Sequence, residues 1–231
     1  ANRQHSKAPG DDGEMAAART RFLEGGWYGP LRETLCALVE KYAPQAPALL
    51  DAGCGEGWYT SALAETVAAM GGRTAGVDLS KPSVKKAARR LPSGEFAVAS
   101  VYHLPLGDGS VDILTDCFSP LGVEEFYRVL KPGGIFLYVV PAPRHLWELK
   151  SVLYEHPYEN EDRREEYPGF RYLDILPVET VFTLPTPQAI GDLYRMTPYF
   201  WKTPRQGAQR LERLEELTVT GQFRIHLFQR L

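Results

Sequence analysis

One short stretch of the chain, residues 49–57, constrains its fold more than any other. Its sequence is Leu-Leu-Asp-Ala-Gly-Cys-Gly-Glu-Gly, an apolar run that meets an acid and then three glycines at alternate positions. Residues 58–70 follow directly, are rich in alanine and leucine, and predict a helix. Glycine lets a ligand approach the backbone closely, and the start of a helix offers unpaired N–H groups. This strand, turn and helix therefore predict a ligand site.

The segments after this turn alternate between strand and helix patterns. We expect strands at 48–51, 73–78, 96–99, 111–115 and 135–140, with helices at 58–70, 82–91 and 121–130. Beyond residue 140 we expect helices at 145–154, 186–196 and 209–217, and two further strands at 178–184 and 219–229. The fold class predicted is α/β, with a doubly wound, mostly parallel seven-stranded sheet covered by helices on both faces.

The length of 231 residues fits one domain with additions. We expect residues 1–47 to form an N-terminal linker and helical segment, with helices at 14–23 and 31–42. Residues 48–231 form the α/β domain in this interpretation. Two insertions rich in helical, charged or aromatic residues interrupt it, at 141–176 and 186–217.

Bulk properties exclude several classes of protein. The formal net charge is only −3, so no global electrostatic attraction to nucleic acid or anionic membrane is expected. No apolar run approaches the roughly 20 residues that span a bilayer, which predicts no membrane association. The three cysteines, Cys36, Cys54 and Cys117, are widely spaced, so we expect neither a disulfide framework nor a metal site within this chain. A cytoplasmic protein is the expectation.

The kind of ligand follows from the residues around the turn. Asp78 ends the second predicted strand, and in a doubly wound sheet such an acid binds ribose hydroxyls of a nucleoside at the carboxyl ends of the strands. Glycines that serve only packing are the alternative. The spacing Gly53-x-Gly55-x-Gly57 differs from the G-x-G-x-x-G of dinucleotide sites, and no G-K-[ST] of a phosphate-binding loop occurs.

Two acids near the turn, Asp51 and Glu56, narrow the nucleoside further. They would repel a pyrophosphate but suit a ligand with an ammonium group and a cationic sulfonium. This argument favours S-adenosylmethionine (SAM) over NAD as the cofactor.

Residues 49–57 and Asp78, together with 100–106 and 129–134, resemble the class I SAM-dependent methyltransferases. The resemblance implies a Rossmann-like fold, SAM as methyl donor and S-adenosylhomocysteine as product. Ser100 stands where that family often has an aspartate that hydrogen-bonds the adenine, so Ser100 is expected to contact the cofactor.

A narrower resemblance extends over nearly the whole chain. Its blocks are residues 9–15, 22–31, 54–60, 143–150, 196–198 and 225–227. They are similar to the bacterial methyltransferases that modify N1 of a guanine in a hairpin loop of 23S ribosomal RNA. This implies 23S rRNA as a partner and an N-terminal zinc-binding module. No Cys-x-x-Cys pair occurs in this sequence, so zinc would belong to a module outside it. The sequence is also compatible with a homodimer.

The same resemblance implies cofactor contacts at four residues, Tyr28, Gly55, Glu56 and His145. They join Gly53, Asp78 and Ser100 as the predicted cofactor site. Tyr28 lies in a glycine-flanked turn and could instead be a core tyrosine. His145 follows the fifth strand at the carboxyl edge of the sheet, and could instead cap a helix.

The methyl acceptor is expected beyond the fourth strand, at residues 116–120. Phe118 could stack on a flipped base, and Trp147 and Trp201 could form a lid or stacking platform, although core packing is an alternative for the tryptophans. Guanine N1 must lose a proton, and Asp116 is a candidate acceptor that could equally point away from the site. The catalytic residue is otherwise unassigned.

The leading hypothesis is therefore a SAM-dependent rRNA guanine-N1 methyltransferase. A methyltransferase acting on a small molecule is one alternative, and the near-neutral charge favours it. A non-catalytic, cofactor-binding protein of ribosome assembly is the other, against which the complete glycine turn argues.

Overall fold

The computed structural model describes residues 13–162 and 164–231. Most of the expected linker, with the start of the block at 9–15, lies outside the described residues, as does Arg163 of the first insertion. Within the described part, no helix is long and apolar enough to cross a membrane.

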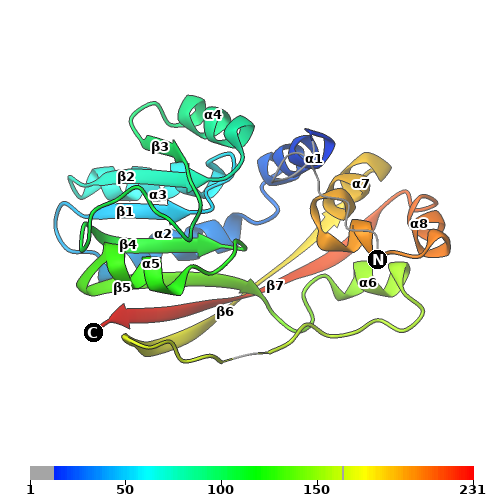
Figure 1. Ribbon diagram of the computed structural model, residues 1–231. Helices are drawn as coiled ribbons and strands as arrows, with labels where there is room; N and C mark the ends of the chain where they lie inside the picture. The colour runs from blue at the N-terminus through cyan, green and yellow to red at the C-terminus, as the bar shows by residue number, and fades with distance from the viewer. Residues whose placement is uncertain (1–12, 163) are drawn as a thin grey trace, which may run out of the picture.

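One seven-stranded sheet organises the molecule, in the order β3-β2-β1-β4-β5-β7-β6 (Figure 1). Strands β1 to β5 are parallel to one another. Strand β7 runs antiparallel to both of its neighbours, β5 and β6. The bounds are β1 Ala48–Ala52, β2 Arg73–Asp78, β3 Glu95–Val98, β4 Val111–Cys117, β5 Leu130–Pro141, β6 Phe170–Leu184 and β7 Leu217–Arg230. The strand order reverses between β1 and β4, which is where ligands bind in open α/β sheets. The predicted fold class is confirmed.

Helices cover both faces of this sheet. The bounds are α1 Gly13–Glu24, α2 Gly29–Tyr42, α3 Trp58–Ala69, α4 Lys81–Arg90, α5 Val123–Val129, α6 Trp147–Leu153, α7 Pro187–Met196 and α8 Arg205–Leu211, with a 3₁₀ turn at Pro198–Trp201. One apolar cluster joins α2 and α3 to one face of the sheet. A second joins α5 to the opposite face. β1 is buried along its whole length because both faces are covered.

Local signals in the sequence begin several of these helices. Ser80 precedes α4, and its hydroxyl accepts a hydrogen bond from the Ser83 N–H at 3.4 Å. Thr186 caps α7 in the same way, through the Ala189 N–H at 3.2 Å. Both helices also carry proline in the first turn, where the missing N–H costs nothing.

The last two strands form a long ribbon that extends past the rest of the sheet. β5 ends at Pro141, opposite Phe223 of β7. The pairing of β6 with β7 continues beyond that point as far as Leu184 opposite Leu217. The ribbon therefore projects past the carboxyl end of β5, toward α6, α7 and α8 (Figure 1).

Two predicted segments differ most from the structure, and the strand expected at 135–140 begins five residues earlier, at Leu130. The helix expected at 209–217 is wrong: α8 begins after Pro204 and ends at Leu211, because a proline at that position favours an earlier helix start. Residues 217 and beyond already belong to β7. The strand expected at 178–184 begins at Phe170, since Pro177 and a bulge at Tyr172 to Asp174 hide the strand pattern in the sequence without ending the pairing.

Candidate active site

A cavity of about 780 Å³ opens at the carboxyl ends of the parallel strands. Its volume lies in the upper part of the range for small-ligand pockets, roughly 300–1,000 Å³. Residues from the ends of β1 to β5 line it, together with the turn before α2 and parts of both expected insertions. We call Gly53, Gly55, Glu56, Asp78 and Ser100 the glycine wall, over β1 to β3. We call Tyr28, His145, Asn160 and residues 196–199 the far wall, beyond β5.

The three glycines of the turn have left-handed backbone conformations but different surroundings. A Cβ on Gly53 would lie 2.3 Å from the Cβ of Ser119, at the end of β4. A Cβ on Gly57 would lie 3.1 Å from Ala87 of α4. Gly55, with φ +53°, has nothing within 4 Å of that position and lines the cavity. Gly53 and Gly57 thus permit packing, whereas Gly55 leaves the backbone open to a ligand.

Asp78 and Ser100 complete the glycine wall from the ends of β2 and β3. The carboxylate of Asp78 accepts hydrogen bonds from the Gly55 N–H at 3.0 Å and the Ser80 N–H at 2.8 Å. Asp78 therefore fixes the glycine turn and also lines the cavity. The Ser100 hydroxyl oxygen accepts the Tyr102 N–H at 3.2 Å, and both residues line the cavity.

The two acids of the turn do not face a ligand as free charges. Glu56 is 8% exposed, and its carboxylate pairs with Lys86 of α4 and accepts a hydrogen bond from Thr20 of α1. Asp51 is buried and accepts hydrogen bonds from the hydroxyls of Thr60 and Thr115. Burial raises the pKa of Asp51 to about 6. The charge argument for SAM is therefore weakened, because Lys86 neutralises Glu56 and Asp51 does not line the cavity.

Tyr28 and His145 meet in the far wall, 117 residues apart in sequence. The Tyr28 hydroxyl lies 3.4 Å from Nε2 of His145, and both residues are buried. His145 Nδ1 lies 2.9 Å from the carbonyl oxygen of Gln222, to which it donates in one tautomer. Burial lowers the pKa of His145 to about 4, so the ring is neutral at neutral pH. In that tautomer the Nε2 lone pair faces the Tyr28 hydroxyl.

The segment 143–150 is attached to the projecting part of β7. Glu148 accepts hydrogen bonds from the Thr220 N–H at 3.0 Å and the Thr220 hydroxyl at 2.9 Å. The Leu146 N–H donates to the Thr220 carbonyl at 2.9 Å. His145 contacts Gln222 two residues further along the same strand. The ribbon therefore holds this part of the far wall in position.

Phe118 lies at the end of β4, between the two walls. Its φ is +65°, a conformation that costs energy for a bulky residue, and the ring is 44% exposed although it contacts Phe223. An exposed aromatic ring held in a strained conformation at a cavity is typical of a ligand contact.

Asp116 lies behind the cavity rather than in its lining. It is 0% exposed, its Oδ1 accepts the Ser119 N–H at 3.0 Å, and its Oδ2 has no hydrogen-bond partner among the residues that the structure describes. Burial raises its pKa to about 8. Trp147 and Trp201 also do not line the cavity: Trp147 stacks under the Arg144 guanidinium, and Trp201 is 66% exposed beside Phe200.

Asn160 and Tyr59 are two of the cavity-lining residues that sequence reasoning did not assign to the site. Asn160 falls in a charged run that predicts only a solvated loop, and no local pattern distinguishes it. Tyr59 follows the glycine turn, and its buried hydroxyl has no hydrogen-bond partner in the described part of the chain. A tyrosine at the start of the helix after the turn was a usable signal. No group of three or more potential metal ligands occurs within residues 13–162 and 164–231.

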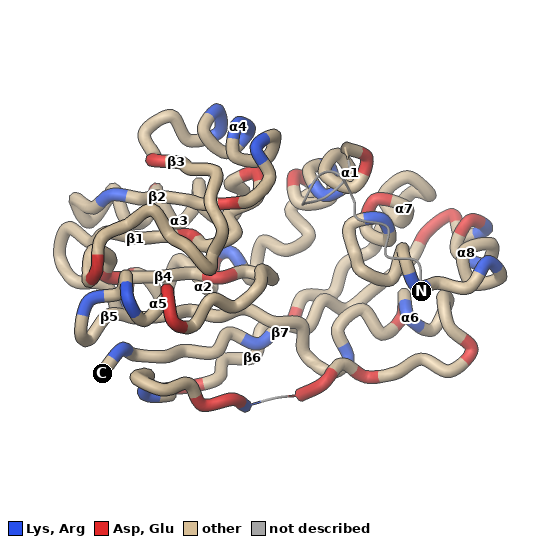
Figure 2. The backbone as a smooth tube through the Cα atoms, in the orientation of Figure 1, with Lys and Arg blue, Asp and Glu red and all other residues tan. Residues whose placement is uncertain are grey.

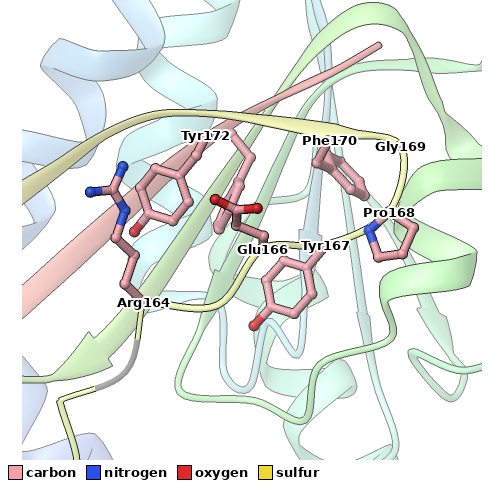
Figure 3. A pocket seen from close by; sticks show the side chains of 8 residues that line it. Arg164, Glu166, Tyr167, Pro168, Gly169, Phe170 and Tyr172 are labelled. Atoms are coloured by element: carbon pink, nitrogen blue, oxygen red, sulfur yellow. The ribbon is translucent and has the colours of Figure 1, made fainter.

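A second cavity, of about 600 Å³, lies at the opposite edge of the sheet. Its lining comes from residues 164, 166–170, 172 and 228, and Figure 3 shows the Arg164 guanidinium beside the ring of Tyr172. The cavity lies toward the amino-terminal half of β5. There Ile135 of β5 pairs with Gln229 of β7, next to the pair of Phe170 and Arg230. Nucleoside ligands bind at the carboxyl ends of such strands, so this cavity is not the predicted site.

Near this cavity, the Tyr172 hydroxyl forms a hydrogen bond with Nδ1 of His226. Because His226 is buried and already has this partner, we assign it a structural role.

The fold of the chain is shared with known enzymes. A family model described as a methyltransferase domain matches residues 50–138. The crystal structure of YcgJ protein from Bacillus subtilis has a TM-score of 0.55 to this chain at 18% sequence identity. The match covers 86% of this chain and 98% of that one. At this identity it supports the common fold alone.

Two relatives match most of the sequence. A 23S rRNA (guanine(748)-N(1))-methyltransferase of Streptomyces fradiae is 32% identical over 237 residues, covering 96% of this chain and 82% of the relative. YxjB of Bacillus subtilis, named provisionally as a 23S rRNA (guanine-N(1)-)-methyltransferase, is 30% identical over 223 residues, covering 90% and 76%. Both matches extend well beyond the common domain at 50–138. The chain therefore belongs to the family of the bacterial 23S rRNA (guanine-N1)-methyltransferases, within the class I SAM-dependent methyltransferases.

Proposed function

We propose that this protein transfers the methyl group of SAM to N1 of a guanine in a hairpin loop of 23S rRNA. One observation carries the proposal. Residues outside the common methyltransferase domain at 50–138 build the far wall of the same cavity whose glycine wall lies inside that domain. Sequence similarity to the rRNA enzymes includes these outer segments. An rRNA substrate would place the protein in the cytoplasm.

The glycine wall fits the cofactor. The open backbone at Gly55 and the adjoining Asp78 suit a nucleoside, with the carboxylate available to ribose hydroxyls. Ser100 is proposed to contact the adenine, and Tyr28 and His145 to contact the cofactor from the far wall. When bound, SAM supplies an electrophilic methyl group on its sulfonium, and S-adenosylhomocysteine remains.

Phe118 and the rest of the far wall, Asn160 and residues 196–199, are proposed to hold the acceptor base. Phe118 offers an exposed ring for stacking, and such stacking on a base contributes roughly 1–3 kcal/mol. Alignment of N1 with the methyl carbon can supply much of the rate enhancement, because methyl transfer needs little covalent assistance. We propose that the insertions at 141–176 and 186–217 serve this positioning, since both contribute lining residues.

A cationic helix next to the cavity suits an RNA partner. Figure 2 shows the Lys and Arg residues gathered on α4, whose N-terminal cap Ser80 lines the cavity. Lys86 and Arg90 are engaged by Glu56 and Glu24. The other three, Lys81, Lys85 and Arg89, are exposed and form no ion pair within the described part of the chain. They are available to phosphates.

The test is methylation of a 23S rRNA hairpin transcript with isotopically labelled SAM, followed by mass spectrometry of the nucleosides. We expect label in 1-methylguanosine. A transcript that already carries 1-methylguanosine at the target position is the control and should accept none. Label on another atom, or in no RNA, would overturn the proposal.

The alternative of a small-molecule acceptor has one observation in its favour, the net charge of −3. It predicts that labelled SAM is consumed with small-molecule extracts and not with the hairpin. SAM binding without transfer to either would favour a non-catalytic role in ribosome assembly.

A further inference from the structure

Lys150, in the middle of α6, is a completely buried cation. Its side chain is 0% exposed, and its Nζ donates hydrogen bonds to the Tyr158 carbonyl at 2.9 Å and to Asn160 Oδ1 at 2.8 Å. The same Nζ lies 4.7 Å from the ring centroid of Tyr158 and 5.3 Å from that of Tyr199. Lysine is almost never fully buried unless it is paired with an opposite charge.

No opposite charge pairs with Lys150. In the part of the chain that the structure describes, no carboxylate lies within ion-pair distance of its Nζ. Its partners are neutral oxygens and the faces of two aromatic rings, which stabilise an ammonium group without cancelling its charge. The positive charge therefore acts on whatever lies next to these partners.

Two of these partners belong to the far wall of the cavity. Asn160 and Tyr199 both line it, so the ammonium group lies one side chain behind the surface that a ligand would touch. Asn160 is held firmly: its side-chain amide donates to the Ala142 carbonyl at 2.8 Å, and its backbone N–H to the Pro143 carbonyl at 2.8 Å. The position of the charge relative to the cavity is thus fixed.

Burial lowers the pKa of Lys150, and the charge of Glu159 partly offsets this. Glu159, in the same loop as Asn160, is half exposed and lies 3.8 Å from Arg144, so it forms no contact ion pair with Lys150. Glu148, on α6 itself, is bound to Thr220 of β7.

The remaining titratable neighbours add no negative charge. Arg210 of α8 donates to carbonyl groups at the end of α6. His145 is neutral, and burial raises the pKa of both Tyr154 and Tyr199. Lys150 is therefore the buried charge that lies directly behind the far wall.

We propose that Lys150 favours the anionic form of the acceptor base and so lowers the pKa of guanine N1–H in the cavity. The inference rests on the proposed function. The N1–H bond breaks and its proton passes to water, while the electron pair stays on the base, spread over N1 and O6. N1 then takes the methyl group as the carbon–sulfur electron pair returns to sulfur. Asp116, the carboxylate considered as acceptor of this proton, does not line the cavity. The positive charge of Lys150 therefore promotes the loss of the N1 proton in place of a general base.

The test is the pH dependence of single-turnover methylation of the hairpin RNA by Lys150→Met, between pH 6 and 9.5. Removal of a unit charge that lies one side chain behind the cavity surface should move the apparent pKa of the reaction upward by roughly one to two units. The rate should therefore fall about 10- to 100-fold at pH 7 and recover at high pH. The dissociation constant for SAM should be unchanged by calorimetry.

A second variant keeps the lysine and cancels its charge. Asn160→Asp places a carboxylate beside Nζ and should shift the profile in the same direction, which covers the case that Lys150→Met fails to fold. Lys41→Met is the matched control, because Lys41 also lies over a tyrosine ring, 5.0 Å from that of Tyr42, but does not line the cavity. It should leave the profile unchanged.

Two outcomes would overturn the inference about Lys150 alone. One is a rate lowered equally at every pH in both variants. The other is a weaker SAM affinity with an unshifted profile, which would assign the cation to the cofactor carboxylate. A wild-type protein that does not methylate guanine N1 refutes the proposed function itself, and with it this inference, before any variant is compared.

Discussion

The glycine wall is largely backbone from one continuous stretch, residues 53–57, completed by Asp78 and Ser100. The far wall consists of side chains from four segments that are distant in sequence: the turn before α2, the loop before α6, the loop at 157–160 and residues 196–199. Changes in the first wall therefore act through backbone conformation, and changes in the second through single side chains. The walls should respond differently to mutation.

Gly55→Val should have the largest effect. The new side chain would enter the cavity from a backbone at φ +53°, so SAM affinity should fall more than about 100-fold by calorimetry. Gly71→Val is the matched control, because Gly71 has φ +78° and open space but does not line the cavity. It should lower stability and leave SAM affinity intact. Equal SAM affinity of Gly55→Val and wild type would refute the glycine wall as the cofactor site.

Asp78→Ala should weaken SAM binding by about 10- to 100-fold. The substitution removes a proposed ribose contact and also the acceptor that holds the Gly55 N–H. Asp174→Ala, an exposed acid in β6, serves as the control. An unchanged dissociation constant for Asp78→Ala would mean that SAM binding needs neither the ribose contact nor the hydrogen bond to the Gly55 N–H.

Phe118→Gly should separate stability from activity in the region between the walls. Glycine accepts φ +65° without strain, so the thermal midpoint should stay the same or rise. Methylation of the hairpin should fall about tenfold through lost stacking. Leu146→Gly, at φ +54° but fully buried, should instead lower the midpoint. A fully active Phe118→Gly would exclude Phe118 from binding the base.

Asp116→Asn should have the smallest effect on turnover, less than about threefold at pH 7, because the native carboxyl is already largely protonated there. Its effect on stability should depend on pH. A carboxyl whose pKa is raised to about 8 in the folded state opposes folding increasingly as pH rises from about 4 to 8.

The free energy of unfolding of wild type should therefore decline over that range relative to the variant, as measured by urea titration at several pH values. A 100-fold loss of turnover would instead identify Asp116 as the base.

The glycine wall could be predicted from sequence because its elements are local. A strand, three spaced glycines, a helix and a distant strand-end acid are all visible in order, and the structure places Gly53, Gly55, Asp78 and Ser100 in one cavity. The roles of these residues in binding the cofactor stay predictions. The charge argument was weakened because Glu56 is paired with Lys86 and bound by Thr20. These partners lie on other helices and cannot be seen in the local sequence.

The far wall could be predicted only in part, and through resemblance. Tyr28 and His145 were expected at the site, yet their contact depends on how β7 and α2 pack, which no local pattern reports. Asn160 and Lys150 gave no signal, because a charged loop and a helical lysine usually face solvent. Their burial follows from the tertiary fold.

The projecting ribbon of β6 and β7 has a consequence for how this family could change its acceptor. The part of the far wall that carries His145 is attached at Thr220 and Gln222, so its distance from the glycine wall is set by a number of strand residues. Each residue pair adds about 3.3 Å, and side chains alternate between the two faces. A single-pair insertion would turn the attached residues away from the cavity. The depth of the site can therefore change only in steps of about 7 Å, two pairs at a time.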